Sequence, residues 1–72
     1  MNLNSAEIGK EYLIIKVDTL DSELNSFLFS LGCYENQPIT VVSRKQSNLT
    51  VAIKDGRYSI DSALAEVIII KD

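Results

Sequence analysis

The side chains that most often perform chemistry are nearly absent from this sequence. Its 72 residues contain no histidine, which removes the commonest general base and the commonest metal ligand. Cys33 is the single cysteine, so it can neither form an intramolecular disulfide nor build a tetrahedral zinc site of the usual kind. A cysteine that follows a helix and has no histidine partner is more often a small core residue than a nucleophile. The sequence therefore predicts no catalytic residue, no cofactor and no enzyme.

The acidic side chains offer one weak alternative, a site for a hard metal ion. Asp18, Asp21 and Glu23 are the only carboxylates that cluster closely in sequence. Acidic residues are also typical of a helix N-terminus, where the helix dipole favours negative charge, and we prefer that interpretation. The three glycines stand far apart, so no glycine-rich loop could hold a phosphate. We expect no metal site.

Two aromatic side chains remain as candidates for binding a protein partner. By the helical step of about 100° per residue, Phe29 points about 140° away from the apolar stripe of its predicted helix. Tyr34 follows the end of that helix in a loop. A lone exposed aromatic residue is common on any surface, but aromatic residues near other apolar groups often anchor interfaces. We predict that Phe29 and Tyr34 contact a partner, with the hairpin around Asp55 as the next candidate.

Charge and composition exclude other classes of function. Ten acidic and seven basic residues give a net charge of −3, and Arg44-Lys45 is the only adjacent basic pair, which argues against nucleic-acid binding. The longest apolar run, residues 67–70, is too short to span a membrane, and the N-terminus does not resemble a signal peptide. A lone cysteine suits a reducing cytoplasm. We expect one cytoplasmic domain over residues 1–72 that does not insert into a membrane.

The candidate residues must be positioned by short strands and one helix. Alternating apolar residues predict strands over 12–17, 39–44, 49–54, 57–60 and 67–70, and Leu13, Ile15 and Val17 should share one face of the first. Polar residues 45–48 form one turn. Asp55-Gly56 reads as the central pair of another, with positive φ at both residues. We also expect a helical turn over residues 6–8 and a short helix over 61–65.

The predicted helix lies between the first two strands. Its apolar stripe comprises Leu20, Leu24, Phe27, Leu28 and Leu31. Asp21 or Asp18 should cap its start, and Gly32 should end it in a left-handed conformation. Cys33 would then pack back near Leu28. Five short strands in so few residues favour a mainly β fold, a small closed or nearly closed barrel with the helix over one open end.

Several segments together resemble the FeoA family of ferrous iron transport proteins. They are Ile8-Gly9, the helix end at residues 29–32, the strand at residues 39–42, the hairpin at residues 55–60 and the final segment at residues 65–70. The family usually has glycine where this chain has Asn36, and Asn is the next best residue for a left-handed turn. It usually has arginine in the helix, where this chain has Asn25 and Ser26.

The resemblance implies an SH3-like barrel that supports or regulates FeoB, a membrane iron transporter, from the cytosolic side. It also leaves an alternative, because the same barrel is similar to the C-terminal domain of iron-dependent repressors of the DtxR type. A third alternative is a protein that senses iron itself.

Overall fold

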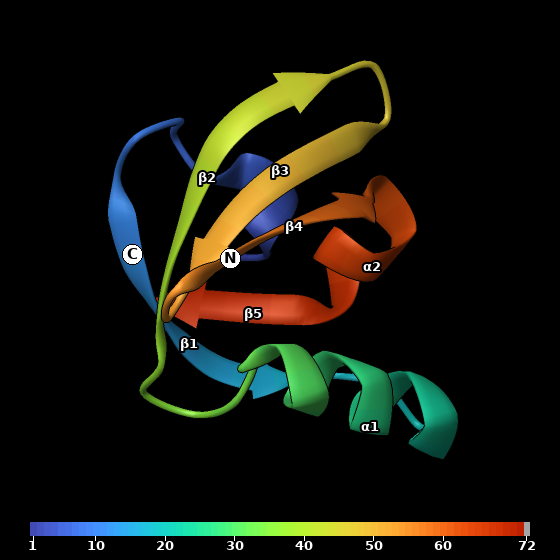
Figure 1. Ribbon diagram of the computed structural model, residues 1–72. Helices are drawn as coiled ribbons and strands as arrows, with labels where there is room; N and C mark the ends of the chain where they lie inside the picture. Colours follow the sequence, from blue (N-terminus) through green and yellow to red (C-terminus); the bar gives the residue numbers. More distant parts are fainter. Residues whose placement is uncertain (72) are drawn as a thin grey trace.

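Five antiparallel strands form a single, strongly curved sheet in the computed structural model, which describes residues 1–71 (Figure 1). The elements are β1 (Glu11–Val17), α1 (Ser22–Leu31), β2 (Pro38–Lys45), β3 (Asn48–Ile53), β4 (Gly56–Asp61), α2 (Ser62–Val67) and β5 (Ile68–Lys71). The strand order is β4-β3-β2-β1-β5. The predicted mainly β architecture, with one helix between the first two strands, is therefore confirmed. Over residues 1–71, β4 and β5 do not pair, so the barrel is not fully closed.

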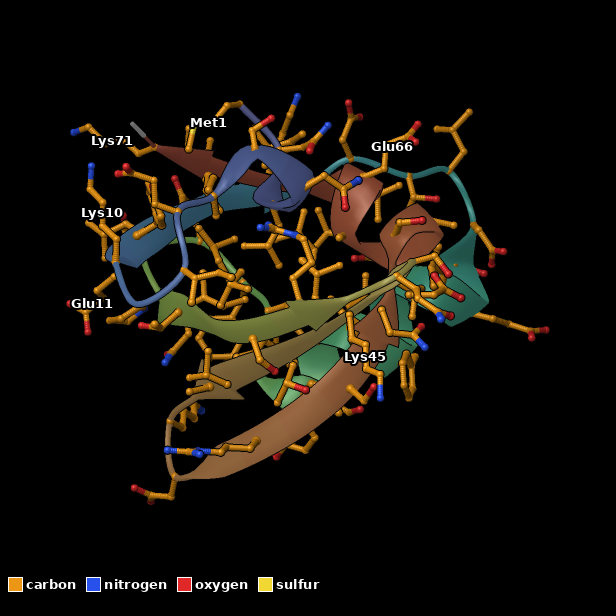
Figure 2. All side chains as sticks on the ribbon, turned by 90° about the horizontal axis from the view of Figure 1, so that it is seen from above. Met1, Lys10, Glu11, Lys45, Glu66 and Lys71 are labelled. Carbon is orange, nitrogen blue, oxygen red and sulfur yellow. The ribbon has the colours of Figure 1, made fainter. Side chains whose placement is uncertain are left out.

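The interior of the curved sheet is filled by aliphatic side chains. The hairpin strands alternate inward and outward, so that Ile39, Val41, Leu49, Val51, Ile53 and Ile60 are all buried. Ile68 and Ile70 of β5 complete the core from the other side. Figure 2 shows the labelled charged side chains of Lys10, Lys71 and Glu66 around the outside of the molecule. No helix in residues 1–71 combines the length and the apolar character needed to cross a membrane.

The prediction for the faces of β1 is wrong. Leu13 and Ile15 are 41% and 43% exposed, whereas Tyr12 and Ile14 are buried. The pairing of β1 with β5 shifts register between Ile14 and Lys16, and this bulge returns Val17 to the core side. Leu13, Ile15 and Val17 therefore do not share one face.

The ends of α1 are set by local chemistry, and they correct the predicted stripe. Asp21 accepts hydrogen bonds from the backbone N–H groups of Glu23 and Leu24, so it is the N-cap and Asp18 is not. Leu20 lies before the cap and is fully exposed, and Phe27 is 50% exposed. The stripe that faces the sheet is Leu24, Leu28 and Leu31, of which only Leu28 is fully buried.

Gly32 ends α1 as predicted. Its φ of 107° and ψ of 10° are left-handed, and its N–H donates to the carbonyls of Leu28 and Phe29. The Cys33 N–H donates to the Leu28 carbonyl at 2.9 Å, and the Cys33 side chain is buried in the same core cluster as Leu28. The loop beyond contains Asn36 with φ 69°, so the asparagine takes the expected left-handed turn.

The turn between β3 and β4 lies one residue earlier than predicted. Ile53 pairs with Gly56, so Lys54 and Asp55 are the two loop residues, and the positive φ belongs to Lys54 (54°) rather than to Asp55 and Gly56 as predicted. At the N-terminus, the helical turn covers Leu3–Ser5 instead of residues 6–8. The predicted short helix after β4 is present as α2, capped by Asp61.

Candidate functional site

An open groove separates the C-terminal end of α1 from the β3–β4 hairpin. Its volume is about 660 Å³. It is lined by residues 29–32, Tyr34, residues 54–56 and Tyr58. Both aromatic residues that the sequence singled out, Phe29 and Tyr34, lie in this lining, and so does the hairpin around Asp55. We call this feature the aromatic groove.

The helix wall of the groove is an aromatic pair. The ring centroids of Phe29 and Tyr34 are 5.1 Å apart and their planes are tilted by 44°, a favourable geometry for two aromatic rings. Phe29 comes from the last turn of α1 and remains 63% exposed. Tyr34 meets it because the left-handed Gly32 reverses the chain, and the Tyr34 N–H then donates to the Gly32 carbonyl at 3.1 Å. The helix end thus places both rings on one surface.

The hairpin forms the opposite wall. The Lys54 ammonium lies 4.8 Å from the centroid of the Tyr34 ring, within the range of a cation–π contact, and so links the two walls. The Tyr58 ring lies over Gly56, where an added Cβ would stand 2.5 Å from the Tyr58 hydroxyl oxygen. The Tyr58 ring therefore lies close to Gly56, which does not have a positive φ. Tyr58 lines the groove although the sequence analysis did not single it out, whereas Lys54 and Gly56 belong to the hairpin around Asp55 that was the next candidate.

Aromatic rings are the main chemical feature of the groove. Cys33 does not line it, and its burial raises the pKa of the thiol to about 11, so the sulfur stays protonated at neutral pH. Within the described part of the chain, no three His, Cys, Asp or Glu side chains come together as a metal site would require. Of the acidic cluster considered above, Asp21 is occupied as the cap of α1. The arrangement suits the binding of an apolar side chain.

Comparison with known proteins identifies a family and a fold. The family model described as the FeoA domain matches residues 1–72. No curated protein matches the sequence. Among solved structures, the chain is similar to FeoA of Stenotrophomonas maltophilia, a procaryotic SH3 domain protein crystallised with zinc, with a TM-score of 0.88, 16% identity and coverage of 99% of this chain and 89% of that one.

Two further structures have the same fold. A crystal structure of an iron uptake regulatory protein, also called FeoA, has a TM-score of 0.88 at 15% identity, covering 99% of this chain and 95% of that one. A manganese-dependent transcriptional repressor has a TM-score of 0.88 at 18% identity, covering 97% of this chain but 39% of the repressor. The predicted SH3-like fold is therefore confirmed, and so is its similarity to a domain of metal-dependent repressors.

Proposed function

The chain belongs to the FeoA family, and from this premise we propose that it is a cytosolic accessory protein of ferrous iron transport that binds a FeoB-type membrane transporter. In this proposal residues 1–72 act as one SH3-like binding domain on the cytosolic side of the transporter. The domain catalyses no reaction, binds no nucleic acid and does not itself insert into the membrane. Its effect on transport follows from contact with the transporter.

The aromatic groove is the observation that carries the proposal. The barrel interior is filled by its own side chains, so a partner must bind on the outside. On the outside, Phe29 is 63% exposed beside two tyrosine rings from other segments. Burying a phenylalanine side chain contributes about 1.5–3 kcal/mol, and aromatic residues are enriched among interface anchors. The groove therefore offers an apolar contact that the isolated chain leaves unused.

The proposal is tested by titrating the purified chain onto a FeoB-type transporter held in detergent. We expect a saturable complex that persists at high salt, because an apolar contact is not screened as exposed charges are. A transporter that shows no saturable binding of the chain at any salt concentration would overturn the proposal.

The similarity to the repressor favours a second candidate, a regulatory module related to the metal-dependent repressors. The FeoA-like barrel covers 39% of that repressor, so the same fold occurs there as one part of a larger regulator. A module of this kind would bind a regulatory protein in place of the transporter, and titration against FeoB would then show no complex.

Iron sensing by the chain itself is the third alternative, and it makes a separate prediction. Thermal unfolding curves recorded with ferrous iron, without it and with a chelator should superimpose, because residues 1–71 gather no set of three potential ligand side chains. A ligand that binds only the folded state raises the melting temperature. A rise of several degrees at micromolar iron would instead identify a metal-binding protein.

A further inference from the structure

β4 has a free edge, and that edge borders the aromatic groove. β4 is the terminal strand of the sheet and pairs only with β3. The opposite terminal strand is covered, since Asn2 bridges to Ile69 and the Ile70 N–H donates to the Met1 carbonyl at 2.8 Å. In residues 1–71, β4 therefore has an edge whose backbone groups are available for another chain.

The register of the hairpin identifies these backbone groups. A two-residue loop is closed by a hydrogen-bonded pair, here Ile53 and Gly56, and bonded pairs alternate along an antiparallel ladder. Gly56 and Tyr58 thus bond to β3, whereas the N–H and C=O groups of Arg57 and Ser59 point away from it. In the described chain, no loop or side chain forms a hydrogen bond with these outward groups.

The side chains along this edge define what kind of chain would fit. Gly56 and Tyr58 line the groove, so a strand added beside β4 would direct alternate side chains toward Tyr58 and the Phe29 ring. An aliphatic side chain suits that position, because the rings of Phe29, Tyr34 and Tyr58 all line the groove.

The hairpin beside this edge carries two positive charges and one negative charge. Lys54 and Arg57 flank the single acid Asp55, in a protein whose net charge is −3. The ion pair found in the described chain joins Lys10 to Glu7, so no carboxylate of residues 1–71 forms an ion pair with either hairpin cation. A carboxylate on the added strand would complement them.

We propose that the partner supplies an extended peptide segment that adds as a strand to β4. The segment hydrogen-bonds to the outward groups of Arg57 and Ser59, inserts an aliphatic side chain into the aromatic groove and places a carboxylate near Lys54 and Arg57. This inference rests on the proposed function, because the segment belongs to the transporter bound there. It adds main-chain pairing as the mode of recognition.

Ser59→Pro tests the main-chain pairing directly. Proline lacks the N–H that the added strand would use, and proline is tolerated on edge strands where that N–H faces solvent. We expect Ser59→Pro to weaken binding to the FeoB-type transporter by roughly two- to tenfold, the loss of one hydrogen bond. Ser59→Ala is the matched control, because it removes the side chain, keeps the N–H and should bind as the wild type does.

Amide exchange in the wild-type chain gives a readout that does not depend on the folding of the proline variant. In the complex, exchange in the fragment covering residues 56–61 should slow by at least about tenfold, because the outward amides become hydrogen-bonded. Unchanged exchange in a saturated complex, with wild-type affinity for Ser59→Pro, would overturn strand addition and leave the proposed function intact. A dimer of the chain that forms without the transporter and protects the same fragment would also overturn it, by assigning this edge to self-association.

Discussion

Gly32→Ala is expected to lower the free energy of unfolding by about 2–5 kcal/mol. Two causes add. The φ of 107° is a conformation that L-residues adopt only with strain, and an added Cβ would stand 2.7 Å from the Ile53 Cγ2 atom. Ile53 is 1% exposed and cannot move away easily. Because a domain of this size is stabilised by only about 4–11 kcal/mol, much of the variant should be unfolded in mild urea.

Gly9→Ala separates the two causes. Gly9 also has a left-handed φ, 86°, but an added Cβ there meets nothing within 4 Å. We expect this control to lose only about 1–2 kcal/mol, from backbone strain alone. Urea denaturation midpoints of the two variants measure the difference. Equal midpoints would mean that the contact with Ile53 does not constrain the end of α1.

Leu28→Ala should destabilise the chain by about 2–5 kcal/mol, the usual range for truncating a buried leucine. Leu28 is the only side chain of α1 that is completely buried, so it is the main attachment of the helix to the sheet. Because α1 carries one wall of the aromatic groove, partner binding should fall together with stability.

Truncation of the neighbouring residue Phe29 should have a much smaller effect on stability than truncation of Leu28. Phe29→Ala removes a side chain that is 63% exposed, so its denaturation midpoint should stay close to that of the wild type. If Phe29→Ala destabilised the chain as much as Leu28→Ala, Phe29 would be a core residue and its proposed role in binding would be wrong.

Local chemistry allowed much of α1 to be predicted from the sequence. An aspartate before the helix and a glycine after it act through their own backbone neighbours, and both caps are where the pattern placed them. Which side chains of β1 face the core could not be predicted in this way. Apolar residues occupy both faces of that strand, and its bulge exists only through pairing with β5, which is more than fifty residues distant in sequence.

The same distinction between local structure and long-range contacts applies to the residues of the candidate site. Phe29 and Tyr34 could be selected because the helical step and the cap determine where they point. Tyr58 and Lys54 could not, because they reach the groove only when the β3–β4 hairpin folds beside the end of α1. The Asp-Gly pattern predicted the turn one residue too late, because Lys54 and Asp55 form the loop and Gly56 already pairs with Ile53.

The central claim is that the transporter binds at the aromatic groove through Phe29. It is tested most directly by comparing how tightly Phe29→Ala and Phe27→Ala bind the FeoB-type transporter. Both residues are exposed phenylalanines on α1, 63% and 50% respectively, but only Phe29 lines the aromatic groove. Loss of an anchoring phenylalanine corresponds to about 1.5–3 kcal/mol, so Phe29→Ala should bind roughly ten- to a hundredfold more weakly by calorimetric titration, while Phe27→Ala binds like the wild type. Wild-type affinity for Phe29→Ala would contradict the account, and weaker binding of Phe27→Ala alone would move the contact to the other flank of the helix.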